Sequence, residues 1–523
     1  MLNCCLTCIS TGILPRKTNF RHFYKWFLHF VERTDIMTVI ILERQVRIME
    51  MQNSEPIRTP PRRRRRSKLQ IFKEAYLPTI ILAVTAVLVL VFIIGGIVNA
   101  DKPQLETPSN NSSGSSSSDT PTTSTGPSSS IKDPATAQEA ADLLRQAAQL
   151  ATDYDYTGAV AKLESFSGIK ADFPELTAAI EAYKAADEAM VSWNAADVYD
   201  LSFHVLLADP QRAFKDAIYA INYRNNFITT TEFTNILGQL YDNGYILVDL
   251  DDFYSLEYNS TSGTYIYVEK QLRLPEGKKP VMLTELSASY YAYMQRGDQD
   301  GMADGLASRL GHDGEVFYNE MINADGSIST GAYDMVPLLE EFISAHPDFS
   351  YRNARAVIAF AGYDRILGYR INDSSLGASV LQAERDGLKA IVETLKATGY
   401  KLACYTYNNV HYGSMTAEQI QTDITMWTER VTPWLGEVDM IVFARESDIS
   451  DEAPYTGNSK FHVLYNAGFR FFSGVGATPW NQVADRYVRH NRLMVTGGYL
   501  LNKSERYTEL FDVDSIWDAA RKQ

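Results

Sequence analysis

Residues 274–294 read LPEGKKPVMLTELSASYYAYM, and the apolar run at 280–286 within them is typical of a buried strand. Other short runs rich in apolar, β-branched or aromatic residues recur on both sides of it along the chain. They lie at 201–207, 245–250, 355–361, 400–406, 440–444, 469–473 and 493–495. This recurrence indicates that one small unit of structure is repeated.

Helical segments stand between these runs. Apolar residues at helical spacing predict helices at 230–242, 334–344, 382–398 and 417–434. Repeated alternation of strand and helix is typical of a parallel α/β fold, and we predict a distorted (β/α) barrel of about seven strands. We place this barrel at residues 197–523. In such barrels chemistry gathers at the carboxyl ends of the strands.

Charge divides the chain into two parts of opposite sign. Residues 1–75 carry a net charge of +9, and the remainder carries −24. A strongly acidic body repels nucleic acid and other anionic polymers, so we expect no nucleic-acid partner. A neutral glycan or a basic protein fits this charge better.

A membrane anchor is predicted at residues 77–98, which are 22 residues without a charged side chain. A helix of that length spans a hydrocarbon core of about 30 Å. Five arginines at 62–66 precede it, which places the N-terminus in the cytoplasm and the main domain outside a single-pass cell membrane. The alternative is a cleaved signal peptide, for which the apolar run is long. Membrane lipid is thus one expected partner.

The remaining boundaries follow from composition. Residues 1–76 form a basic cytoplasmic tail, and translation is hypothesised to begin at Met49 or Met51, which would leave 1–48 untranslated. Residues 99–132 are a Ser/Thr/Pro-rich linker with almost nothing apolar to bury. Residues 133–196 carry helical stripes and predict a small all-α segment, a helical hairpin that serves as a stalk.

Four segments of the barrel region resemble the polysaccharide deacetylase family, also called the NodB-homology domain, a group of carbohydrate esterases. The first two are residues 228–254 (ITTTEFTNILGQLYDNGYILVDLDDFY) and 274–294. The others are 395–409 (LKATGYKLACYTYNN) and 468–476 (GFRFFSGVG). The resemblance covers residues 198 to 502 and implies the same barrel fold.

The resemblance also implies an activity, namely hydrolysis of acetyl groups on sugars at a divalent metal, usually zinc. One Asp and two His would hold the metal, and a neighbouring Asp would be the general base. The Asp-Asp pair of the family falls here on Leu286 and Ser287, and the two histidines fall on Tyr405 and Asn409. Since none of these side chains suits its role, we predict no metal and no cofactor.

Other residues offer an alternative zinc or divalent-metal site. No two histidines of the chain lie four residues apart, but Glu285, His204 and His411 are candidates to converge at the barrel mouth. Glu285 and Ser287 would share one face of a strand. The alternative interpretation is that these residues have no role in metal binding and form a polar pocket floor and a solvent-exposed histidine.

Binding residues are predicted at the same end of the barrel. Arg445 and Asp448 lie where the family contacts substrate, so they would bind sugar hydroxyls or pair with each other, alongside Tyr405 and Asn409. The favoured function is a membrane-anchored deacetylase-like protein, catalytically inactive, that binds cell-wall glycan or a surface protein. The alternatives are an active metal-dependent glycan deacetylase with a rearranged site, and a surface scaffold acting through the helical segment.

Overall fold

The computed structural model describes residues 133–216, 218–295, 304–455 and 457–522. The basic tail, the membrane span at 77–98 and the linker that the sequence predicts all lie outside these ranges. Within them, no helix combines the length and the apolarity that crossing a bilayer requires.

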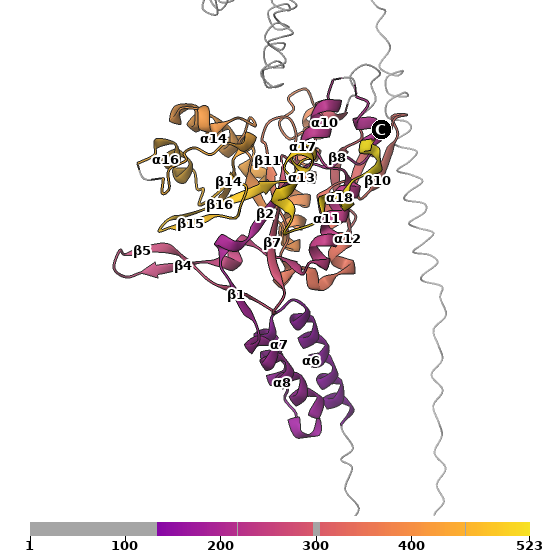
Figure 1. Ribbon diagram of the computed structural model, residues 1–523, viewed down its shortest axis with the longest axis vertical. Coiled ribbons are helices and arrows are strands. Elements are labelled where there is room, and N and C mark those ends of the chain that lie inside the picture. Colours follow the sequence, from indigo (N-terminus) through magenta and orange to yellow (C-terminus); the bar gives the residue numbers. More distant parts are fainter. Residues whose placement is uncertain (1–132, 217, 296–303, 456, 523) are drawn as a thin grey trace, which may run out of the picture. The chain divides into compact units, whose positions relative to one another are not determined.

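Seven parallel strands close into a barrel, as predicted. Each strand pairs with the next in the order β11-β12-β13-β14-β16-β2-β7, and β7 pairs in turn with β11. The strands are β2 (Tyr199–His204), β7 (Lys279–Leu286), β11 (Val357–Phe360), β12 (Lys401–Cys404), β13 (Met440–Val442), β14 (Phe471–Val475) and β16 (Tyr487–Met494). Figure 1 shows them at the centre of the domain.

The predicted run at 245–250 forms only a short strand outside the ring. This strand, β3 (Tyr245–Leu247), pairs with the first three residues of β7, whereas Thr284 to Leu286 of β7 pair with β11. The eight residues of β7 therefore pair with β3 at the start of the strand and with β11 at its end. The last run was also placed too narrowly, because β16 begins at Tyr487 rather than at 493.

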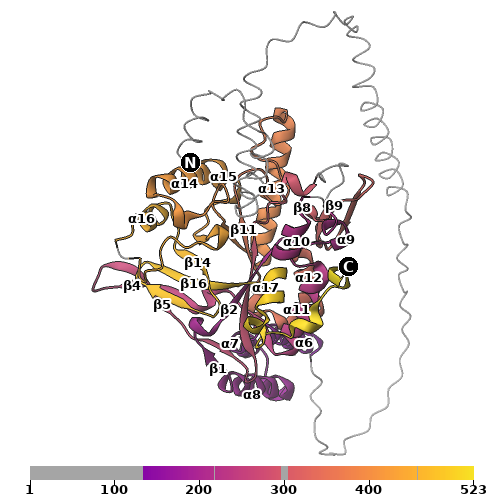
Figure 2. The ribbon, with the colours of Figure 1, turned by 45° about the horizontal axis from the view of Figure 1, so that its top comes forward.

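Helices cover the outside of the barrel. They include α11 (Thr230–Asp242), α12 (Met335–Ala345), α13 (Ala378–Thr398) and α14 (Ala417–Arg430). In Figures 1 and 2, α11 and α12 lie on one side of the strands and α14 and α16 (Ser459–Asn466) on the other. The start of α11 is fixed by a capping box between Thr229 and Glu232, and Gly399, at a φ of 116°, ends α13.

Side chains alternate between the helices and the barrel interior along each strand. On β2, Leu201 and Phe203 join the core under the helices, while Ser202 and His204 face inward. The interior holds polar as well as apolar side chains. Its buried polar residues include Asp200, Ser202, Thr284, Ser473, His490 and Arg492.

Three helices precede the barrel and have a small core of their own. They are α6 (Pro134–Thr152), α7 (Tyr156–Glu164) and α8 (Pro174–Glu188). Their contacts with the barrel domain include a hydrogen bond from the Tyr154 hydroxyl to the Asp348 carbonyl at 2.6 Å and an ion pair between Arg352 and Asp155 at 3.1 Å. Strand β1 (Val191–Trp193) then pairs with β6 (Leu272–Leu274).

Several elements between the barrel strands were not predicted. An antiparallel sheet forms from β8 (Ala307–His312), β9 (Phe317–Ile322) and β10 (Ile328–Gly331), and a hairpin from β4 (Tyr254–Asn259) and β5 (Thr264–Glu269). Strand β15 (Asn481–Ala484) pairs with β16. Two short helices, α9 (Pro210–Ala213) and α10 (Ala220–Asn226), follow β2, and two more, α17 (Gly497–Asn502) and α18 (Val513–Ile516), follow β16. The helix predicted at 417–434 is divided into α14 and a short α15 (Thr432–Leu435).

Candidate functional site at the barrel mouth

Unusual backbone conformations gather at the carboxyl ends of four consecutive strands, the end we call the mouth. Residues other than glycine rarely have a positive φ, and those that do cluster at functional sites. Here they follow β7, β11, β12 and β13 in pairs. They are Ser287 (59°), Tyr290 (50°), Asp364 (61°), Leu367 (51°), Thr406 (61°), Asn409 (52°), Arg445 (57°) and Glu446 (54°). The mouth is thus the candidate site.

Two of the residues predicted for the site, Ser287 and Asn409, meet there around the Tyr291 hydroxyl, and a third, Arg445, contacts the backbone of Asn409. The Ser287 and Tyr291 hydroxyls form a hydrogen bond, and Asn409 Nδ2 donates to the Tyr291 hydroxyl at 3.3 Å. Arg445 Nε donates to the Asn409 carbonyl at 2.8 Å. Burial raises the pKa of Tyr291 to about 12, so its phenol stays neutral.

Tyr405 stands beside a buried arginine that sequence reasoning missed. The Arg492 guanidinium, 1% exposed, donates through Nη1 to the carbonyls of Ser473 (2.7 Å) and Gly474 (3.1 Å). Its Nη2 donates to the Phe443 carbonyl at 2.6 Å. Burial raises the pKa of Tyr405, and the positive charge of Arg492 opposes that rise. The only sequence signal for Arg492 is a charge beside the last apolar run.

His204 is a neutral side chain at the mouth. Loss of solvent, followed by the field of Arg492, lowers its pKa to about 4. Its ring lies 5.3 Å from that of Phe227, measured between centroids.

The three candidate substitutes for a metal site do not come together. In the register of β2 and β7, Phe203 pairs with Glu285 and His204 with Leu286, so Glu285 faces the helices while His204 faces inward. His411 is an exposed residue whose Nδ1 accepts from the Ser414 amide at 3.2 Å. Nor do Glu285 and Ser287 share a face, because β7 ends at Leu286 and Ser287 turns the chain.

Glu285 belongs instead to a buried acid pair behind the mouth. Burial, with neighbouring Asp334 as the second cause, raises the pKa of Glu285 well above its usual range. Burial also raises the pKa of Asp334 to about 6, although its carboxylate accepts from the Leu206 amide at 2.8 Å. Both acids are buried beside the ends of β2 and β7 and are closed to substrate.

Arg445 and Asp448 do not pair with each other, which corrects one of the two readings of these residues. Arg489 Nη2 donates to Asp448 Oδ2 at 3.0 Å, and the Tyr455 hydroxyl donates to Oδ1. Arg489 is nearly buried on β16, so this ion pair fixes the loop after β13.

Stacked tyrosines form one wall of the mouth. The Tyr291 ring lies 5.2 Å from that of Tyr363 and 5.8 Å from that of Tyr293, at interplanar angles of 25° and 14°. Tyr219 and Tyr293 lie 5.0 Å apart. Burial raises the pKa of Tyr293 and of Tyr363 above that of a free phenol. The wall therefore presents neutral hydroxyl groups.

The residues at the mouth do not fit the divalent metal that the family resemblance implies. A hydroxyl, a phenol and an amide (Ser287, Tyr405, Asn409) stand at the ligand positions, where the chemistry needs carboxylate and imidazole. The buried positive charge of Arg492 further disfavours a cation. In the parts of the chain that the structure describes, no three His, Cys, Asp or Glu side chains group as a metal site.

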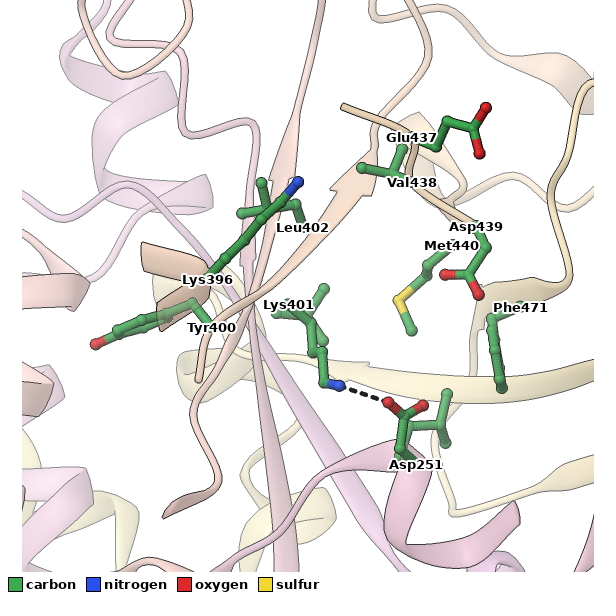
Figure 3. A pocket seen from close by; sticks show the side chains of 12 residues that line it. Asp251, Lys396, Tyr400, Lys401, Leu402, Glu437, Val438, Asp439, Met440 and Phe471 are labelled. Carbon is green, nitrogen blue, oxygen red and sulfur yellow. Dashed lines mark hydrogen bonds and ion pairs between the residues drawn. The ribbon is translucent and has the colours of Figure 1, made fainter. Parts of the chain in front are cut away.

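A cavity of about 190 Å³ lies at the opposite end, where β12, β13 and β14 begin. Figure 3 shows Lys401 paired with Asp251 in its wall, and Asp439 nearby. Lys396 donates to the Leu435 carbonyl. The two lysines of the wall are thus engaged within the protein, and the cavity shares no residue with the mouth.

Comparisons with known proteins add little. No protein-family model matches the chain, and no curated protein matches it. Among solved structures, the Streptococcus pyogenes deacetylase PplD in complex with acetate matches at 12% identity and a TM-score of 0.30, over 59% of this chain and 94% of that chain. The fold assignment therefore rests on the strand order and register: the chain carries a closed α/β barrel with a polar, strained mouth.

Proposed function

We propose that the barrel mouth binds a neutral glycan and that the protein does not carry out metal-dependent deacetylation. The observation that carries the first part is the neutral lining of hydroxyl and amide groups joined through Tyr291. Sugar hydroxyls both donate and accept hydrogen bonds, as do Ser, Tyr and Asn side chains. The acidic body supports a neutral ligand over an anionic one.

The side chains available for chemistry support the second part of the proposal. Hydrolysis of an acetyl group needs an activated water and a base that takes its proton. Glu285 is protonated and faces away from the mouth, and the low pKa of His204 makes it a weak base. The side chains at the mouth are therefore suited to binding a ligand and not to transferring a proton.

The cellular setting is part of the proposal and rests on sequence alone. An apolar span at 77–98 after five arginines supports a single-pass anchor with the barrel outside the cell, and a spacer at 99–132 would hold the barrel at a distance from the bilayer. Cell-wall glycan is the ligand within reach of such a protein. A surface protein that docks on α6, α7 and α8 is the competing partner.

The experiment is calorimetric titration of the full-length protein, in detergent, with two oligosaccharides of equal length. One is a tetramer of N-acetylglucosamine, which is neutral, and the other contains uronic acids. We expect the neutral tetramer to bind more tightly, and to lose affinity when Tyr291→Phe and Asn409→Ala are combined. Equal or stronger binding of the uronate chain, or full affinity in the double variant, would contradict a neutral glycan site at the mouth.

A further inference from the structure

Three polar atoms inside the barrel have no hydrogen-bond partner among the described residues. They are Ser473 Oγ, His490 Nδ1 and Arg492 Nε, on side chains that are 0%, 5% and 1% exposed. Ser473 of β14 is the register partner of His490 of β16, and Arg492 follows on the same face of β16. The three side chains thus face one region of the interior from two neighbouring strands. Buried polar atoms of this kind require a partner.

The surrounding hydrogen bonds fix what each atom can offer. His490 Nε2 lies 3.1 Å from Asp200 Oδ2, and the Thr284 hydroxyl donates to Asp200 Oδ1 at 2.8 Å. Because a carboxylate only accepts, Nε2 carries the proton in this pair, which leaves Nδ1 as the ring nitrogen that a neutral imidazole uses as an acceptor. Arg492 uses both Nη atoms on carbonyls, so its Nε–H remains as a donor.

One acceptor, one donor and one hydroxyl that can do either define the chemistry of the ligand. An anion would face the lone pair of His490 Nδ1, and a cation would face the guanidinium of Arg492. Water donates to the first and accepts from the second, and buried waters commonly make about three hydrogen bonds of this kind.

We propose that the barrel interior holds one bound water between Ser473, His490 and Arg492. This water completes a hydrogen-bonded chain that begins at the Asp200 and His490 pair and ends at the Phe443 carbonyl, two residues before Arg445. The chain links the centre of the barrel to a strained residue of the mouth, and ordered networks of this kind rigidify the groups they join. The proposal does not depend on the nature of the ligand at the mouth.

The first test is a crystal structure of the full-length protein grown in bromide, at a resolution that shows ordered water. We expect a density peak without anomalous signal, within about 3.2 Å of all three atoms. An anomalous bromide peak there would make the site an anion site. A direct Ser473–His490 hydrogen bond with no density between would show that nothing is bound, and either result overturns the proposal.

A second test counts long-lived internal waters in solution by oxygen-17 relaxation dispersion. Ser473→Val fills the position with a methyl group and is expected to remove one such water. The matched control is Ser202→Ala on the inner face of β2, since Ser202 already bonds within the protein to Met494 Sδ at 3.2 Å and should release none. An unchanged count in Ser473→Val contradicts a water at this position. If Ser473→Val does not fold, the crystal structure alone decides.

Discussion

Asn409 donates a hydrogen bond from its side-chain amide to the Tyr291 hydroxyl at 3.3 Å, across the mouth from the end of β12 to the end of β7. In the family that the sequence resembles, a histidine would stand at the Asn409 position and bind metal. Here the same position takes part in a hydrogen bond that joins the loops after β12 and β7.

Tyr291→Phe removes the hydroxyl that joins Ser287 and Asn409 and keeps the stacked ring. We expect glycan affinity to fall about 5- to 10-fold, because a neutral hydrogen bond contributes about 1 kcal/mol. Calorimetric titration measures the change. The control is Tyr258→Phe on the exposed face of β4, which should bind as the unaltered protein does. Equal affinity in both variants would mean that the ligand does not use Tyr291.

Arg492→Met removes the guanidinium that donates to the Ser473, Gly474 and Phe443 carbonyls, and we expect a loss of unfolding free energy of about 3 kcal/mol or more. Because the field of Arg492 is the second cause of the low pKa of His204, that pKa should rise toward its ordinary value. Chemical denaturation and NMR titration of the His204 ring measure the two effects. Arg486→Met on an exposed arginine serves as the control. An unchanged pKa of His204 would mean that the charge of Arg492 does not act on the His204 ring.

The acid pair predicts a pH dependence of stability with a definite sign. The pKa of Asp334 in the folded protein, about 6, lies above its ordinary value, so the folded state keeps a proton that the unfolded state releases. Stability from this pair is fully present below about pH 4 and falls as pH rises toward 6, by an amount on the order of 1 to 3 kcal/mol.

Glu285→Gln tests this sign, because glutamine resembles the protonated acid in the folded state and has no proton to release in the unfolded state. Denaturation between pH 4 and 7 should show a smaller loss of stability in the variant than in the unaltered protein. A steeper loss in the variant would refute the shared-proton pair.

Glu384 should behave in the opposite way. Backbone and side-chain hydrogen bonds from Arg370 and Arg309 outweigh burial and hold its pKa below the usual range. Its contribution to stability is present above the ordinary glutamate pKa and is lost as pH falls through the lowered value. Glu384→Gln should therefore destabilise the protein at pH 7 and much less at pH 3, as measured by thermal unfolding. Equal destabilisation at both values would mean that packing, not charge, is lost.

The barrel was predictable from the sequence because buried parallel strands and amphipathic helices each leave a strong local pattern. The helix at 230–242 matches α11 residue for residue. The β4–β5 hairpin was not predicted because its strands are largely exposed and lack the apolar run that is typical of a core strand.

The site was harder to predict because it depends on the register of the strands and on which distant groups the long side chains contact. Whether Glu285 faces His204 is decided by the pairing of β2 with β7, which strand patterns alone do not give. Arg492 was not predicted because a charged residue in a sequence usually indicates the end of a buried strand. Only the fold shows that its guanidinium donates to the Phe443 carbonyl.

The most direct test is to follow an N-acetylated neutral oligosaccharide with the full-length protein, before and after removal of metal by a chelator and after addition of zinc. Calorimetry would report binding, and proton NMR would report released acetate. We predict the same affinity in all three states and no acetate in any of them. Acetate that appears with zinc and disappears with the chelator would contradict a glycan-binding barrel without metal chemistry and would restore a deacetylase.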